Sequence, residues 1–315
     1  MGNFSLLLLI LPLGLLLDRL LGEPGRWHPL VGFGRLAKGL EGMLRKGAPG
    51  DALGNRLRGT LAWMLLVLPL PLACGWLLAQ LHWPTALAGH ALLLWFALGG
   101  RSLAEHVEAV AAPLAAGDIA LARERLGWLV SRDTAGLGAE EIARAAVETT
   151  LENGNDAVFG ALFLAALLGG PGALAFRFAN TLDAMCGYKD ERRVYFGWCA
   201  ARADDLLGLL PARLTALTYA LLGRGSDALG CWRVQAGAWS SPNAGPVMAA
   251  GAGALGVSLG GAATYHGRVE ARPVLGCGPA PAAADIPRAL RLVSQGSLLW
   301  GALALASTSL GVVLA

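Results

Sequence analysis

One segment of the sequence repeats charged side chains at helical spacing. Between residues 138 and 153 they fall at positions i, i+4, i+8 and i+12, and the set comprises Glu140, Arg144, Glu148 and Glu152. Side chains at this spacing share one face of a helix, and Asp156 follows shortly after. A solvated face with paired charges is the usual meaning of this pattern. The alternative is a row of hard oxygen ligands for Mg²⁺, an ion that is commonly shared with nucleotide phosphates.

A second polar segment, residues 180–193, combines amides, carboxylates and cations. It contains Asn180, Asp183, Lys189 and Arg192, and Lys189 is the only lysine after position 46. A lysine and arginines among carboxylates could bind phosphate groups. A charged loop at the membrane surface would have the same composition. The residues alone leave both interpretations open.

These polar segments belong to a chain that is otherwise apolar. Of its 315 residues, 55% are hydrophobic and only 15% are charged, whereas soluble globular domains carry about 25% charged residues. The net charge of +3 gives no reason to expect a nucleic-acid partner. The five cysteines show no CxxC spacing and are expected to be reduced thiols. The composition therefore excludes an ordinary soluble enzyme.

The apolar runs predict an all-α, polytopic integral membrane protein with cytoplasmic helical segments. A membrane helix needs about 20 mainly apolar residues, and four runs meet this requirement, at about 4–21, 60–80, 85–100 and 296–315. We expect residues 1–315 to form a single membrane-embedded domain with a polar helical region at 101–205.

Three further apolar runs are less regular. Runs 206–222 and 245–262 are additional candidate spans, although Arg213 would be costly in the middle of a bilayer. Run 158–178 is interrupted by Gly169-Gly170-Pro171-Gly172, which favours a re-entrant hairpin or a buried helix pair over one span. The polar helix before it, 138–153, is expected to end at Asn153-Gly154, a common left-handed stop.

The distribution of lysine and arginine predicts the orientation in the membrane. Segment 22–58 holds seven of these residues, whereas the link 81–84 holds none. The positive-inside rule therefore places 22–58 in the cytoplasm. Two helices later the chain returns to the same side, so region 101–205 and the chemistry that it carries are expected to face the cytoplasm.

Taken in order, the motifs of the chain resemble the CbiB/CobD family of cobalamin biosynthesis, the adenosylcobinamide-phosphate synthases. The likeness extends over nearly the whole chain. The matching stretches are 18–24, 28–29, 130–134, 146–153, 180–183, 187–189, 195–198, 201–202, 204–205, 211–215 and 241–245. The chain departs from the family pattern at Glu23, where the family commonly has aspartate, and at Met248, where it often has glutamate.

This resemblance implies a membrane-embedded, ATP-dependent amide ligase. It would join the free propionate of a corrinoid, adenosylcobyric acid, to the amine of (R)-1-amino-2-propanol O-phosphate, giving adenosylcobinamide phosphate. A carboxylate is a poor acyl donor, so the expected route is an acyl phosphate formed with ATP and Mg²⁺. The expected setting is the bacterial inner membrane, with lipid and other membrane enzymes of the pathway as neighbours.

The matched motifs supply the expected site residues, and their roles are inferred from side-chain chemistry. Glu148, Asp183 and Lys189 are expected to be catalytic. The expected Mg²⁺ ligands are Glu148, Glu152, Asp156 and Asp183. The expected contacts to nucleotide, phosphate and corrin amides are Arg132, Asp133, Thr134, Asn153, Asn180, Arg192 and Asn243.

Two other functions share this architecture. A non-catalytic membrane sensor related to the family would not need the clusters around Glu148 and Lys189. A corrinoid transporter should place ionisable groups inside its spans, where Arg213 and Arg177 are the candidates. Most charges lie in the loops instead, which favours the enzyme.

Overall fold

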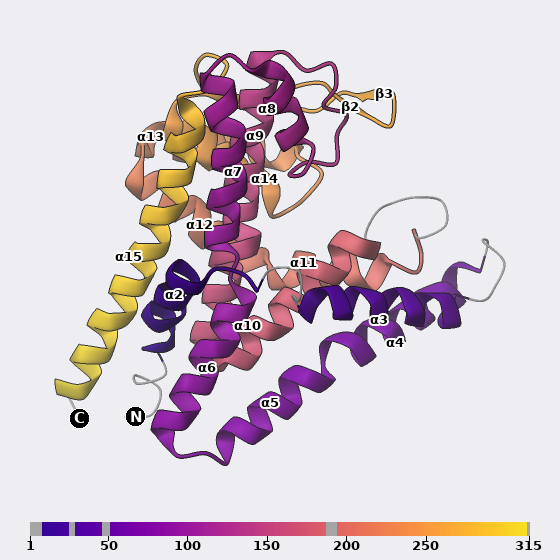
Figure 1. Cartoon of the computed structure of the whole chain (residues 1–315), viewed down its shortest axis with the longest axis vertical. Helices are drawn as coiled ribbons and strands as arrows, with labels where there is room; N and C mark the ends of the chain where they lie inside the picture. Colours follow the sequence, from indigo (N-terminus) through magenta and orange to yellow (C-terminus); the bar gives the residue numbers. More distant parts are fainter. Residues whose placement is uncertain (1–7, 25–28, 46–50, 187–193, 314–315) are drawn as a thin grey trace. The chain divides into compact units, whose positions relative to one another are not determined.

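The computed structural model describes residues 8–24, 29–45, 51–186 and 194–313, and these residues are predominantly helical. Their packing divides the chain into two compact units. The first unit comprises Met1–Gly99, Gly160–Gly208 and Gly301–Ala315, and the second comprises Gly100–Phe159 and Leu209–Trp300. Figure 1 labels the elements along the chain.

The first unit is built around one long helix. Its elements are α2 (Ile10–Leu21), α3 (Pro29–Leu44), α4 (Ala52–Val67), α5 (Pro69–Ala79), α6 (Trp83–Ala97), α10 (Gly160–Cys186) and α11 (Trp198–Leu207). Helix α10 packs against α6 and α11, and α2 packs against α6. The rings of Phe33 and Phe178 stack at 4.4 Å between centroids and so join α3 to α10.

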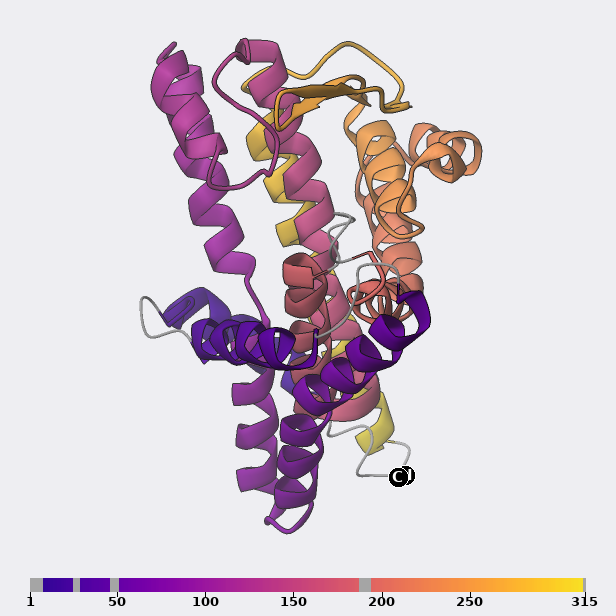
Figure 2. The ribbon, with the colours of Figure 1, turned by 90° about the vertical axis from the view of Figure 1, so that its right-hand side faces the viewer.

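The second unit combines helices with four short strands. Its helices are α7 (Gly100–Ala115), α8 (Ile119–Leu126), α9 (Ala139–Gly154), the π-helix η1 (Asn155–Phe159), α12 (Leu209–Leu222), α13 (Gly225–Gln235), the 3₁₀ turn η2 (Ala236–Ala238) and α14 (Ala244–Leu255). Helix α14 packs against both α12 and α13, and Figure 2 shows these helices side by side. The last helix, α15 (Asp285–Val313), contributes its residues up to Trp300 to this unit.

The strands form two antiparallel pairs that the sequence did not indicate. Strand β1 (Ser258–Gly260) pairs with β4 (Val274–Gly276), and β2 (Ala263–Tyr265) pairs with β3 (Arg268–Glu270). Gly260 and Gly261 have φ of +77° and +79°, values that favour glycine, and they redirect the chain from β1 into the β2–β3 hairpin.

The helix that carries the charged row does not end where the sequence predicted. The Asn153-Gly154 stop is wrong, because α9 continues through η1 into α10. Gly154 lacks a positive φ. It serves close packing instead, since an added Cβ would lie 2.7 Å from the Tyr219 hydroxyl and from a Val293 methyl. Asp156 therefore lies in a continuing helix and not in an exit turn.

The described residues contain four helices long and apolar enough to cross a membrane. These are Ala52–Ala79, Trp83–Ala115, Ala139–Cys186 and Asp285–Ser309, and α11 with α12, bent by 45°, would make a fifth. The all-α membrane prediction is confirmed, but the set of spans differs from the predicted one. The described part of run 4–21 is only the 12-residue α2. A further candidate span is 139–186, within the region predicted to be polar.

Run 245–262 does not form a span. Helix α14 has 12 residues, all of them buried in protein, and is about 18 Å long, whereas the hydrocarbon core is about 30 Å thick. Gly256, with φ of +69°, ends it. The apolar character of this run therefore reflects burial among α12, α13 and α9.

The glycine-rich break in α10 bends the helix without reversing it. Gly169 has φ of +71°, and the helix resumes at once. The N–H of Gly170 donates a hydrogen bond to Nδ1 of His90 on α6, at 3.0 Å. The run is thus divided at Gly169 into two helical parts joined across a kink, where His90 provides an acceptor for a backbone N–H.

We predict that Gly169→Ala destabilises the protein by about 1–3 kcal/mol. The new Cβ would require the strained positive φ and would lie 2.7 Å from the His90 ring. The measurement is the thermal unfolding midpoint in detergent. Gly39→Ala is the control, because Gly39 lies within α3 with no atom near its Cβ position. Equal midpoints for the two variants would contradict the prediction.

Candidate functional site

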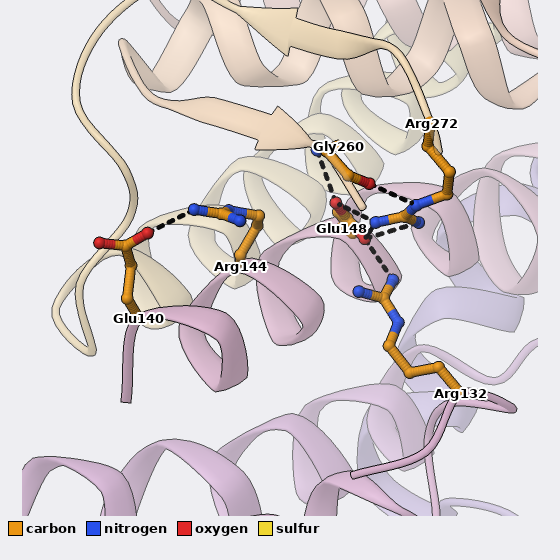
Figure 3. A network of polar contacts seen from close by, with 7 residues as sticks. Arg132, Glu140, Arg144, Glu148, Gly260 and Arg272 are labelled. Carbon is orange, nitrogen blue, oxygen red and sulfur yellow. Dashed lines mark hydrogen bonds and ion pairs between the residues drawn. The ribbon is translucent and has the colours of Figure 1, made fainter. Parts of the chain in front are cut away.

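The carboxylate of Glu148 is the centre of a buried ionic cluster in the second unit (Figure 3). Only 3% of this side chain is exposed. Its Oε1 accepts hydrogen bonds from the Gly260 N–H at 2.7 Å and from Arg272 Nη2 at 3.2 Å. Its Oε2 accepts from Arg272 Nη1 at 3.2 Å and from Arg132 Nη2. One carboxylate therefore joins a helix, a loop and a strand end.

The two arginines reach Glu148 from different parts of the chain. Arg132 lies in the loop between α8 and α9, and Arg272 follows strand β3. The Arg272 Nε also donates to the Gly261 carbonyl at 3.0 Å. Its Cζ lies 5.3 Å from the ring centroid of Trp239, a cation–π contact. The Arg272 guanidinium is thus fixed by three different kinds of contact.

Asp133 ties the loop of Arg132 to the β2–β3 hairpin. Its backbone N–H donates to the Thr264 carbonyl at 2.9 Å, and its Oδ2 accepts from the Gly267 N–H at 2.8 Å. Gly267 and His266, at the hairpin turn, have φ of +74° and +50°. The sequence predicted that Asp133 contacts a substrate, and in the structure Asp133 fixes the hairpin that precedes Arg272.

Further along α9 the same row continues with polar residues. Glu152 is within the electrostatic influence of Glu148, Asp156 and both arginines of the cluster. The Asn155 amide donates to Asp156 Oδ1 at 2.9 Å and accepts from the Thr215 hydroxyl at 3.1 Å. These contacts lie at the π-helix η1, an irregularity that is frequent at functional sites.

Asn243 lies at the start of α14 and is buried. Its side-chain oxygen accepts a hydrogen bond from Arg213 Nη1 at 2.9 Å. The Ser241 hydroxyl accepts from the backbone N–H groups of Asn243 and Ala244, at 3.3 and 3.2 Å. The Ser241-Pro242-Asn243 segment therefore precedes α14, and its Asn243 side chain pairs with the charge of Arg213. This pairing offsets part of the cost of burying that arginine.

The predicted magnesium ligands fit this geometry only in part. Within the described residues, no group of three or more His, Cys, Asp or Glu side chains is arranged to hold a metal ion. Both oxygens of Glu148 already accept hydrogen bonds, so this residue does not suit the role of metal ligand. Of the other three, Glu152 and Asp156 lie in this unit, whereas Asp183 lies in the first. Two carboxylates fit Mg²⁺, because this ion usually keeps several waters and shares substrate phosphates.

The other predicted residues are distributed between the two units. Asn153 lies half-buried on α9, and Thr134 lies in the loop of Arg132, both in the second unit. Asn180 and Asp183 lie on α10 in the first unit, where the Asn180 amide donates to Asp204 Oδ1 at 3.3 Å. The remaining two predicted site residues, Lys189 and Arg192, lie outside the described residues.

Sequence reasoning missed several members of the cluster, and Arg272 is the most important. It is 124 residues away from Glu148 along the chain and lies in a segment that contains none of the predicted site residues. No periodicity connects the two positions. Gly260 contributes through its backbone N–H, which has no signature in the sequence beyond the Gly260-Gly261 pair itself.

Comparisons with known proteins place these observations in a family context. The family model for CobD/Cbib proteins matches residues 11–293. A relative from Chromobacterium violaceum named "Cobalamin biosynthesis protein CobD" is 60% identical over 96% of this chain and 97% of its own length. Relatives of the same name from Stutzerimonas stutzeri and Mycobacterium tuberculosis are 58% and 40% identical, over 91% and 90% of this chain and 93% and 91% of their own. No solved structure matches the chain.

We predict that Asp133→Ala releases the β2–β3 hairpin. Loss of its hydrogen bond to the Gly267 N–H should accelerate amide hydrogen exchange in segment 263–270 by about tenfold. Asp133→Asn keeps an acceptor oxygen and should give a smaller effect. Asp118→Ala, which removes only the cap of α8, is the control. Unchanged exchange in Asp133→Ala would show that the hairpin is held by other contacts.

Proposed function

The chain belongs to the CobD/CbiB family of cobalamin biosynthesis, and on that premise we propose that it is an ATP-dependent amide ligase. The proposed reaction joins the free propionate of adenosylcobyric acid to the amine of (R)-1-amino-2-propanol O-phosphate and gives adenosylcobinamide phosphate. We place the reaction at the cytoplasmic side of a bacterial inner membrane, in a protein with several apolar helices long enough to span it.

The observation that carries this proposal is the composition of the face of α9 and η1. Two arginines meet Glu148 there, and Glu152 and Asp156 follow along the same row. Ligation through a phosphorylated carboxylate needs cations around phosphate oxygens and oxygen ligands for the magnesium that accompanies ATP. The second unit supplies both kinds of group.

The proposed chemistry uses these side chains mainly to position reactants and stabilise charge. Glu152 and Asp156 would hold Mg²⁺, which neutralises charge on the nucleotide phosphates. Arg132 donates hydrogen bonds to phosphate oxygens as charge shifts onto them. The attacking ammonium must lose a proton before its nitrogen bonds to the acyl carbon, and a carboxylate of the site accepts that proton.

The residues outside this cluster keep their predicted roles within the proposal. Lys189 and Arg192 keep the proposed role of phosphate contacts, and Asp183 keeps the proposed role of a catalytic residue. Asn153 and Asn180 donate hydrogen bonds to the amide-rich corrin edge. Asn243, whose side-chain oxygen pairs with Arg213, keeps its proposed role at the same corrin edge.

We predict that the purified protein, folded in detergent or lipid, forms the amide product from adenosylcobyric acid, aminopropanol phosphate and MgATP, with release of ADP. Mass spectrometry of the corrinoid and an ADP assay measure the two products. If neither forms in a folded preparation, the ligase proposal fails. Corrinoid uptake into proteoliposomes without amide formation would support the transporter instead.

We also predict that Glu152→Gln and Asp156→Asn each lower kcat/KM by about 10²-fold or more, because each removes a charge proposed to act through magnesium. Raising the Mg²⁺ concentration should restore part of the lost activity. The matched control is Glu140→Gln on the exposed start of the same helix. Wild-type kinetics for both site variants would exclude these two residues as magnesium ligands.

A further inference from the structure

We infer that Arg132 and Arg272 form a phosphate-binding pair and that Glu148 is the residue that positions them. This inference rests on the proposed ligase function, since it states which part of a substrate the ionic cluster takes. Arg272, which the sequence did not indicate, becomes a substrate-binding residue. Glu148, which the sequence predicted to be a magnesium ligand, becomes the residue that holds the two arginines in place.

The hydrogen bonding of Glu148 defines its role. Four donors occupy its two oxygens: the Gly260 N–H, two nitrogens of Arg272 and one nitrogen of Arg132. A carboxylate in this state has little capacity left for a metal ion or for proton transfer. What it does is hold two cationic groups, from chain segments far apart in the sequence, against the same helix (Figure 3).

Arg132 retains donors that could reach a ligand. A guanidinium carries five N–H donors, and Glu148 is the one hydrogen-bonded acceptor of Arg132 in the part of the chain that the structure describes. Its side chain is 11% exposed, so it is mostly buried but still partly accessible to solvent. Figure 3 shows the Nη1 and Nε edges of Arg132 turned away from Glu148.

Arg272 supplies a second charge that is already fixed in place. Its side chain is 13% exposed, and Glu148, the Gly261 carbonyl and the Trp239 ring restrain it. A preorganised arginine loses little conformational entropy when a ligand arrives. The β2–β3 hairpin, fixed by Asp133, keeps Arg272 near Arg132.

The charge and shape of the pair favour phosphate over other ligands. Two guanidiniums meet the single carboxylate of Glu148, and the nearby carboxyl of Glu152 adds to the negative charge around them, so the donor geometry of the arginines carries the argument. The planar donor edges of arginine match the spacing of phosphate oxygens. Two substrates of the proposed reaction carry this group, namely the nucleotide and the amino-alcohol phosphate.

The test measures ligand binding directly, on the full-length protein in lipid nanodiscs. The probes are the non-hydrolysable nucleotide MgAMP-PNP, (R)-1-amino-2-propanol O-phosphate and inorganic phosphate, each followed by calorimetry. Arg132→Ala and Arg272→Ala should each lower the affinity for inorganic phosphate by about 10- to 100-fold. Both variants should also lower the affinity for one of the two substrate probes, and it should be the same probe in both. The substrate probe that weakens identifies the source of the phosphate.

Variants that preserve folding make the result specific. Arg132→Lys and Arg272→Lys keep the ion pairs with Glu148 and lose the planar fork, so they should bind the affected probe about tenfold more weakly. Glu148→Gln should raise KM for that substrate more than it lowers kcat, and Glu148→Asp should recover part of the affinity. Arg144→Ala is the matched control, because Arg144 lies on the same helix and pairs with Glu140.

Two outcomes separate this inference from the proposed function. If the wild type forms amide and the folded arginine variants bind all three probes with wild-type affinity, the pair is structural and the inference fails while the ligase stands. If the wild type forms no amide but binds inorganic phosphate through both arginines, the ligase proposal fails while the phosphate site stands.

Discussion

The second unit depends on the requirement that a buried charge be paired. Glu148 lies on a helix whose neighbouring residues are apolar and almost fully buried, and an isolated carboxylate there would be strongly destabilising. Two arginines and one backbone N–H satisfy it. Removing one partner of such a cluster costs about 3–5 kcal/mol. The cluster therefore fixes the loop before α9 and the strand segment near α14, which are otherwise distant along the chain.

Close helix packing makes this arrangement possible. An added Cβ at Gly251 of α14 would lie 2.7 Å from Leu151 of α9, and one at Gly253 would lie 2.6 Å from the Asp227 carbonyl of α13. Small residues allow backbones to approach in this way. The Tyr219 hydroxyl donates to the Leu151 carbonyl at 3.1 Å, beside the π-helix, where the regular backbone pattern changes. The Tyr219 hydroxyl is therefore buried in this apolar interior together with a specific hydrogen-bond partner.

The pairing of buried charge and the close packing of helices explain why the site contains two kinds of residue. Some residues hold other parts of the protein in place, and others have groups that could meet a ligand. Asp133, Glu148 and Asn243 have oxygens committed to other parts of the protein. Arg132 keeps unused donors, and Glu152 has electrostatic neighbours in place of an ion pair. A site that must bind anions and a cation together needs both kinds of residue, because the open groups stay in place only if others hold their supporting segments.

The sequence by itself determined the helical membrane class, the family and the row of Glu140, Arg144, Glu148 and Glu152, because hydropathy and helical spacing are local properties. Only the tertiary structure decided that Gly154 continues a helix, that run 245–262 is buried in protein and that Arg272 meets Glu148. Each of these outcomes depends on a neighbour far away along the chain. Gly154 meets Tyr219 and Val293, and the Arg272–Glu148 pair spans 124 residues, so no local pattern could have shown them.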